Sequence, residues 1–136
     1  MAKFQLLIVQ SIEGCMVENY QEQYPVLYRE ASKLKERATF PMDENASLSM
    51  LIDGKKRKDY YDATYFIEAT PVTESIINGM LRMYLINEII VYTIPVMLYT
   101  GRRLFQSELA KTDWKCTDTK VLKDGSVRTV FRKQEK

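Results

Sequence analysis

The chain has 136 residues, of which 46% are hydrophobic and 28% are charged. These proportions are typical of one globular domain with a substantial core, and they exclude a largely disordered or fibrous protein. The net charge of +2 is unevenly distributed: residues 101–136 carry ten Lys and Arg against five Asp and Glu, whereas residues 1–100 carry ten against thirteen. The basic C-terminal segment can attract phosphate groups or an acidic partner, although a solvated surface is the more common origin of such a charge.

The cysteines and the apolar segments bear on the compartment. Cys15 and Cys116 are the only cysteines, and neither belongs to a CxxC or Cys/His cluster. The N-terminal apolar stretch is too short for a secretory signal and lacks its cleavage site. Polar and charged residues interrupt the apolar region 76–99, so no membrane span is expected. We therefore predict a cytoplasmic protein, or one assembled into a particle made in the cytoplasm.

The first half of the chain is expected to form a strand, a helix and a hairpin. A short apolar run predicts a strand over residues 3–9. Helical spacing after Pro25 predicts a helix that ends before Pro41, because the residue preceding a proline avoids the α region. Alternating apolar residues on both sides of an Asp-Gly turn predict a hairpin over residues 47–68.

The middle of the chain contains the strongest apolar signal. Thr70-Pro71 is a typical helix start and predicts a helix over residues 71–86. Residues 88–100 form the longest nearly uncharged apolar run, and their β-branched and aromatic content favours a strand covered on both faces. Pro95 has no N–H for a strand ladder, so it predicts a bulge, a bend or a free edge there.

The order of these elements, β-α-β-β-α-β, predicts an α+β fold of the split βαβ or ferredoxin-like type, with its sheet packed on two helices. A short helix is expected over residues 102–111. An Asp-Gly turn then predicts a C-terminal hairpin over residues 117–132. Because neither face of this hairpin is consistently apolar, we expect a peripheral arm. The predicted division is a core domain over residues 1–111 and a basic arm and tail over residues 112–136.

No recognisable catalytic motif is present. The chain has no histidine, and therefore lacks the commonest general base and metal ligand. It has no nucleophile elbow, P-loop or dinucleotide fingerprint. Asp43 and Glu44 could join Asp53 or Asp59 around a divalent cation, but loop carboxylates more often only face solvent. The sequence thus indicates no catalytic residue, no metal site, no cofactor and no small-molecule ligand.

These exclusions leave a non-catalytic protein that acts by protein–protein contact in a homo- or hetero-oligomeric assembly. Components of phage particles and secretion-type machines are compact single domains of this kind, which is an analogy at the level of class. Aromatic residues, methionine and arginine are enriched at interfaces. The predicted contact residues lie at the basic hairpin tip, after the central strand and on the arm: Lys55, Lys56, Arg57, Lys58, Arg102, Arg103, Trp114, Val121, Arg128, Val130 and Phe131.

The alternative is a nucleic-acid-binding domain that uses the basic hairpin tip and the basic C-terminal segment. Basic residues beside aromatics suit single-stranded nucleic acid, and Tyr60, Tyr61 and Tyr65 follow the tip. The segment lacks the glycines of the RNA-recognition motif, however, and Asp62 and Glu68 on the expected open face would repel phosphate. This alternative is therefore limited to non-specific electrostatic contact.

Overall fold

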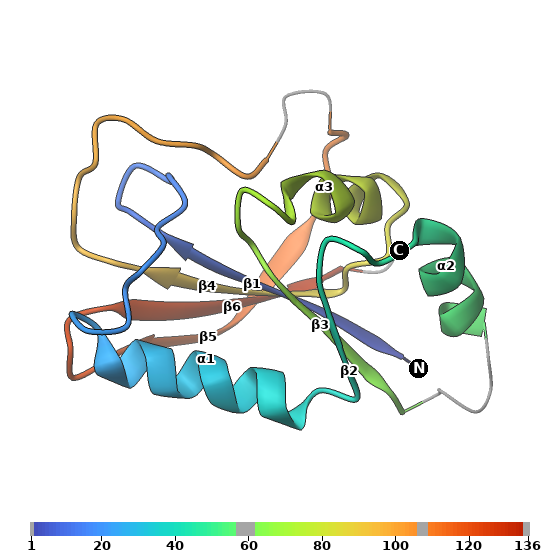
Figure 1. Ribbon diagram of the computed structural model, residues 1–136, viewed down its shortest axis with the longest axis horizontal. Helices are drawn as coiled ribbons and strands as arrows, with labels where there is room; N and C mark the ends of the chain where they lie inside the picture. The colour runs from blue at the N-terminus through green and yellow to red at the C-terminus, as the bar shows by residue number, and fades with distance from the viewer. Residues whose placement is uncertain (1, 57–61, 106–108, 135–136) are drawn as a thin grey trace.

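The computed structural model describes residues 2–56, 62–105 and 109–134, and these residues form one mixed sheet with helices on both faces (Figure 1). The strands are β1 (Lys3–Gln10), β2 (Phe40–Met42), β3 (Thr64–Glu68), β4 (Glu88–Thr93), β5 (Trp114–Val121) and β6 (Val127–Lys133). The helices are α1 (Pro25–Arg37), α2 (Leu48–Lys56) and α3 (Glu74–Arg82).

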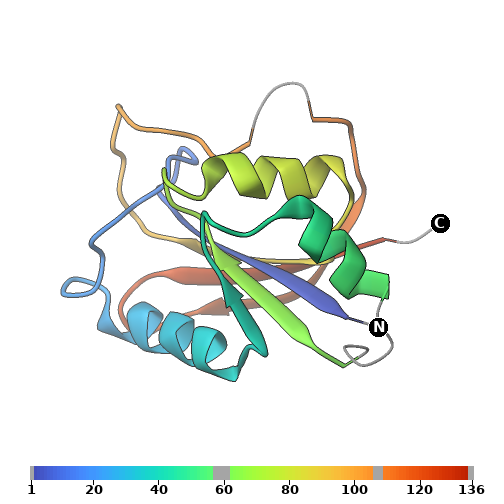
Figure 2. The same ribbon diagram turned by 45° about the vertical axis from the view of Figure 1, so that its right-hand side comes forward.

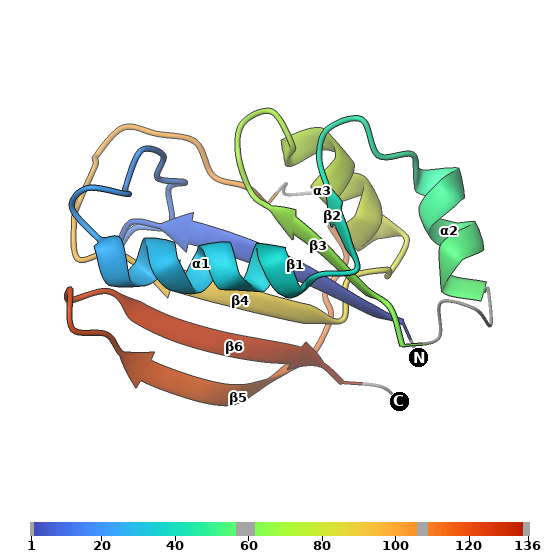
Figure 3. The ribbon, with the colours of Figure 1, turned by 60° about the horizontal axis from the view of Figure 1, so that its bottom comes forward.

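The sheet has the strand order β2-β3-β1-β4-β6-β5. Its first four strands run parallel, because β1 pairs in parallel with both β3 and β4, and β2 pairs in parallel with β3. β6 is antiparallel to β4, and β5 is antiparallel to β6. Figure 3 shows β5 as the outer strand beside β6. Parallel neighbours need long crossover connections, which the three helices supply.

The helices divide between the two faces of the sheet (Figures 1 and 2). α1 leads from β1 to the β2 edge, whereas α2 and α3 lead back from that edge, so right-handed crossovers place α1 opposite the other two. Leu27 of α1 packs in a cluster with Leu7, and Ile77 of α3 packs in a second cluster with Leu6. No helix in the described residues combines the length and the apolar character that a membrane span requires.

The fold-class prediction is wrong. A ferredoxin-like fold needs an antiparallel hairpin over residues 47–68, but residues 48–56 form α2, and β3 pairs in parallel on both sides. In this helix Leu51 is buried at 4% exposure, whereas Met50 is 71% exposed. The alternation of apolar residues that predicted a strand covers too few residues to exclude a helix, which explains the error.

Three further elements differ from the predicted ones. α3 is shorter than the predicted helix 71–86, because Thr70 and Thr73 form a hydrogen-bonded turn before it. β4 ends at Thr93, two residues before Pro95, so only the first part of the run 88–100 is strand. The described residues within 102–111 form no helix. The prediction of a central strand is confirmed for β4, which lies between β1 and β6.

The C-terminal hairpin forms, but it belongs to the main sheet. β6 pairs with β4 from Glu88↔Arg132 to Thr93↔Val127. Leu122, in the turn of the hairpin, is buried at 5% exposure in the α1-face cluster. The hairpin is therefore an edge of the sheet and not the peripheral arm that we expected. The domain boundary between residues 111 and 112 stays a prediction.

Gly54 allows α2 to lie directly against the sheet. A Cβ atom at this position would collide with the hydroxyl oxygen of Tyr65. The Tyr65 ring is buried and stacks on Phe4 with 4.4 Å between ring centroids, so it has little room to move.

We expect Gly54→Ala to lower the free energy of unfolding by about 1–3 kcal/mol through overpacking. This loss should prevail even though alanine is favoured over glycine in a helix by about 1 kcal/mol. Urea unfolding measures the change. In a Tyr65→Phe background, which removes the hydroxyl, the same substitution should be close to neutral; equal losses in both backgrounds would contradict the contact.

Candidate functional site

The carboxyl ends of β1, β3 and β4 meet at one end of the sheet (Figure 1). The segment after β1 turns toward the face of the sheet that α1 covers, and the segment after β3 turns toward the face that α3 covers. In open α/β sheets, ligands commonly bind outside the carboxyl ends of the strands at such a switch point. We call Glu68, the last residue of β3, together with the segments that follow these strands, residues 11–24, 69–73 and 94–104, the carboxyl-end site.

Glu68 brings a carboxyl group to this site at the end of β3. It lies opposite Leu7 of β1 in the strand register. Its half-buried carboxyl is hydrogen-bonded to the hydroxyl of Tyr20, a residue with only 6% exposure. The Tyr20 ring in turn makes an edge contact with Tyr28 of α1, with ring centroids 6.3 Å apart.

The surroundings of Glu68 favour its neutral form. Burial raises the pKa of the Glu68 carboxyl above its ordinary value, and the charge of Lys35 and the Tyr20 hydroxyl offset only part of this effect. The pKa of Tyr20 is raised as well, first by burial and then by the charge of Glu68. A carboxyl that holds its proton to higher pH than usual can act as a proton donor.

The loops after β1 and β4 are joined through Glu13. Its carboxylate accepts hydrogen bonds from the backbone N–H groups of Leu98, at 3.0 Å, and Tyr99, at 2.8 Å. A hydrogen bond from the Ser11 side chain, followed by these two bonds, lowers the pKa of Glu13 to about 2. The Met16 N–H also donates to the Arg102 carbonyl at 2.8 Å. These contacts fix the two loops against each other as one wall of the carboxyl-end site.

The turn between β3 and α3 satisfies its own polar groups. The Thr70 N–H donates to Thr73 Oγ1 at 2.9 Å, and the Thr73 hydroxyl donates to the Glu68 carbonyl at 2.8 Å. Glu74 places a carboxylate in the first turn of α3, where it pairs with Arg102 at 3.0 Å. A carboxylate of the chain itself therefore lies in the first turn of α3, where the helix dipole favours negative charge.

Two cavities lie on opposite faces of β4 and β6. The cavity on the α1 face has about 330 Å³ and contains an ionic network in which Arg128 contacts both Glu30 and Asp118 at 2.8 Å. The Tyr92 hydroxyl donates to the same Glu30 carboxylate at 2.8 Å. Burial, followed by this hydrogen bond, raises the pKa of Tyr92.

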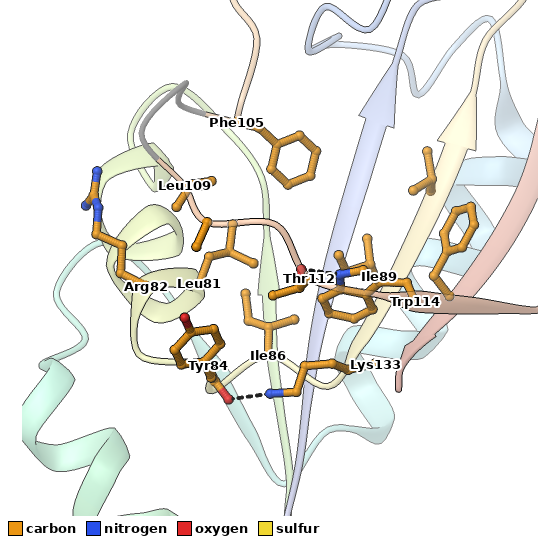
Figure 4. A pocket seen from close by; sticks show the side chains of 13 residues that line it. Leu81, Arg82, Tyr84, Ile86, Ile89, Phe105, Leu109, Thr112, Trp114 and Lys133 are labelled. Carbon is orange, nitrogen blue, oxygen red and sulfur yellow. Dashed lines mark hydrogen bonds between the residues drawn. The ribbon is translucent and has the colours of Figure 1, made fainter. Parts of the chain in front are cut away.

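The cavity on the α3 face, which we call the apolar pocket, has about 570 Å³ (Figure 4). It lies beside the C-terminus of α3 and the amino end of β4, at the opposite end of β4 from the carboxyl-end site. It is lined by Leu81, Arg82, Tyr84, Ile86, Ile89, Val91, Phe105, Leu109, Ala110, Thr112, Trp114, Phe131 and Lys133.

The predicted contact residues of the hairpin are divided between these cavities. Trp114 and Phe131 line the apolar pocket, whereas Arg128 and Val130 line the cavity on the α1 face. Val121, at the end of β5, is 70% exposed. The alternation of side chains along β6 thus separates residues that were predicted to act together.

The remaining predicted contact residues are basic. Arg102 pairs with Glu74, and Arg103 is exposed beside it. Lys56 is exposed at the end of α2. Outside the described part of the chain lie Arg57, Lys58 and the side chain of Lys55. As a set of contact residues for a partner, these side chains stay a prediction.

Sequence reasoning missed the Glu68–Tyr20 pair. It assigned Glu68 to an open face of a hairpin, whereas β3 is an inner parallel strand whose end is half covered. Tyr20 lies in a segment without regular apolar spacing, which carried no signal of burial. A carboxylate directly after a buried apolar run was the one available indication.

Comparisons with known proteins identify the fold. No protein-family model and no curated protein matches this chain. RibD of Acinetobacter baumannii aligns with 98% of this chain and 58% of its own, with a TM-score of 0.68 and 12% identity. The riboflavin biosynthesis reductase of Saccharomyces cerevisiae aligns over 98% and 89% of the two chains, with a TM-score of 0.58 and 9% identity. Dihydrofolate reductase of Schistosoma mansoni aligns over 96% and 97%, with a TM-score of 0.58 and 9% identity.

The fold is therefore the α/β fold of these reductases, and this chain spans little more than half of RibD. That finding contradicts the predicted class of function, because the proteins that share the fold are enzymes. The predictions of a non-catalytic structural component of an assembly and of a nucleic-acid-binding domain are corrected accordingly. The predicted lack of a small-molecule ligand is corrected with them.

Replacement of Glu68 should change how stability depends on pH. Because the pKa of Glu68 is raised from 4.5, the folded protein holds this proton more tightly than the unfolded chain does. This contribution to stability is present below the unfolded pKa and is lost as the pH rises through the folded pKa. The free energy of unfolding of Glu68→Gln minus that of the wild type should therefore increase with pH, starting above about pH 4.

Urea unfolding across this pH range provides the measurement. Glu36→Gln is the matched control, since Glu36 is an exposed carboxyl on α1. If the difference for Glu68→Gln changes with pH no more than that of the control, the pKa of Glu68 is not raised.

Proposed function

We propose that the protein is a reductase that acts on a small organic molecule at the carboxyl-end site. The observation that carries this proposal is the fold, which is shared with reductases over nearly the whole chain. The neighbours are named for riboflavin biosynthesis, pyrimidine reduction and dihydrofolate reduction. These names have nitrogen heterocycles in common, so we infer a substrate with an unsaturated bond in such a ring.

Glu68 is suited to deliver the proton that this reaction requires. Reduction of a C=N or C=O bond adds a hydride to one atom and a proton to the other. Burial raises the pKa of Glu68, so its carboxyl holds the proton to higher pH than an ordinary glutamate does, and it is hydrogen-bonded to the Tyr20 hydroxyl. The proton would pass from Glu68 to the basic atom of the substrate, and the charge of Lys35 would stabilise the carboxylate that remains.

The β3–α3 turn does not fit a nicotinamide dinucleotide. Such cofactors place their pyrophosphate at a helix N-terminus, beside glycines that let the backbone approach closely. Residues 69–73 contain no glycine, Pro71 has no N–H, and the side chain of Val72 projects into solvent at 63% exposure. Glu74 adds a negative charge at the same place. We therefore assign no step to a dinucleotide at this turn.

The sequence-based prediction of a cytoplasmic location is kept as part of this proposal. Cys15 and Cys116 are both free thiols. Free thiols persist in reducing compartments, which supports the prediction.

The purified protein should oxidise a reduced donor when a heterocyclic substrate is present. The donors to compare are NADPH, NADH and reduced flavin mononucleotide, the last of which contains no pyrophosphate. Dihydrofolate and an amino-substituted pyrimidine serve as substrates, and mass spectrometry detects a product with two added hydrogens. Glu68→Gln should lower the turnover by about 100-fold or more, the effect of removing a general acid.

Glu36→Gln, which removes an exposed carboxyl of the same type, should leave the turnover unchanged. Wild-type turnover by Glu68→Gln would contradict its role as the proton donor. If no donor is oxidised with either substrate, and no donor shifts the NMR resonances of the protein, the reductase proposal is wrong.

A further inference from the structure

The apolar pocket has the dimensions and the walls of a small-molecule site. Its volume of about 570 Å³ falls within the range of about 300–1,000 Å³ that such sites occupy. Figure 4 shows the rings of Tyr84, Phe105 and Trp114 around the cavity, with Ile86 and Ile89 on the sheet side. Tyr84 is 51% exposed and Phe105 is 50% exposed, so both rings stand at the mouth of the pocket.

Two basic residues line the apolar pocket. In the described part of the chain, the two charged residues that line it are Arg82 and Lys133, and both are cationic. The Lys133 ammonium donates to the backbone carbonyl of Tyr84 at 2.8 Å and lies 5.6 Å from the centre of the Tyr84 ring. Figure 4 shows this bond at the edge of the cavity. Figure 4 also shows Arg82 pointing away from the rings, so a ligand that buries apolar surface here would gain by placing an anionic group beside Lys133.

The backbone conformation of Tyr84 is a second, independent indication that the apolar pocket is a ligand site. Tyr84 follows the C-terminus of α3 with a φ angle of 55°, in the left-handed region. Its N–H donates to the Leu81 carbonyl at 3.1 Å, and the Leu85 N–H donates to the Met80 carbonyl at 3.0 Å. Glycine is the favoured residue at this kind of helix end. Side chains held in such a conformation cluster at ligand sites, and this ring is too exposed to be explained by packing in the core.

We propose that the apolar pocket binds an aromatic organic anion. The ring system of the ligand would lie between Tyr84, Phe105 and Trp114, and its anionic group would lie beside Lys133. This site is separate from the carboxyl-end site, so the inference does not depend on the proposed reductase activity.

The test compares two probes with the same rings and different charge. Anilinonaphthalenesulfonate carries one sulfonate, and phenylnaphthylamine carries none. Trp114 is the only tryptophan in the chain, so quenching of its fluorescence reports directly on the pocket. We expect one saturable site for each probe, with binding about threefold tighter for the sulfonate, as one partly solvated ion pair with Lys133 would supply.

Three variants locate the interactions. Lys133→Gln should weaken binding of the sulfonate by about threefold and leave the neutral probe unaffected. Arg82→Gln should leave binding of both probes unchanged, because Arg82 points away from the rings. Tyr84→Gly should weaken the binding of both probes by about tenfold without lowering the free energy of unfolding of the protein. Tyr99→Gly is the matched control, because Tyr99 also has a positive φ, 61°, but is 83% exposed in a loop outside the pocket.

The proposal is overturned if the two probes bind equally well, or if Lys133→Gln does not weaken binding of the sulfonate. It is also overturned if sedimentation shows an oligomer that Tyr84→Gly dissociates, since the pocket would then be an interface between copies of the chain.

Discussion

The parallel pairing of β1 with both β3 and β4 is the constraint on which the rest of the structure depends. β1 has neighbours on both edges and buried side chains on both faces, so residues 4–9 are covered from all sides. Parallel neighbours cannot be joined by tight turns, and helical crossovers therefore have to carry the chain over the faces of the sheet. Asn87 fixes the start of this arrangement: its side chain accepts from the Phe4 N–H at 2.8 Å, and its own N–H donates to the Phe4 carbonyl at 3.1 Å. The carboxyl ends of β1, β3 and β4 meet at one place because these strands run in the same direction.

Polar contacts attach the C-terminal hairpin to this parallel core. The Glu88 carboxylate, only 6% exposed as a residue, accepts from Gln5 of β1 at 2.7 Å and from Arg132 of β6 at 3.3 Å. Arg128 of β6 reaches Glu30 of α1, and its Nε atom is buried without a hydrogen-bond acceptor among the described residues. Removing one partner of such a half-buried network leaves an uncompensated charge, so the contacts specify where the hairpin lies more than they stabilise the fold. Asp124, in the turn of the hairpin, accepts a hydrogen bond from the Leu27 N–H at 2.9 Å. Leu27 lies in the first turn of α1, where the N-cap residue Tyr24 makes no side-chain hydrogen bond, so Asp124 replaces the missing cap.

The sequence was sufficient for elements with long or unambiguous patterns. The first strand, the helix after Pro25, the apolar strand of β4 and the last hairpin all occur near their predicted positions. It was insufficient where a short pattern fits both a helix and a strand, as at Leu48–Ile52. Because this segment was predicted as a strand, the prediction contained an antiparallel hairpin where the structure has a helix and a parallel strand. The candidate site depended on the strand order, because Glu68 and Tyr20 become neighbours only when β3 lies beside β1. The apolar pocket was equally hidden, since Tyr84, Trp114 and Lys133 belong to three separate segments.

The segment between β4 and β5 touches both the carboxyl-end site and the apolar pocket. Arg102 pairs with Glu74 at the start of α3, and the Asn78 side chain donates to the Leu104 carbonyl at 2.9 Å. Phe105, the next residue, stands at the mouth of the apolar pocket. α3 makes the same connection, with Glu74 at one end and Tyr84 just past the other. One loop and one helix therefore connect the two sites directly. If a ligand at one site changes the affinity of the other, linkage requires the reverse effect to have the same factor.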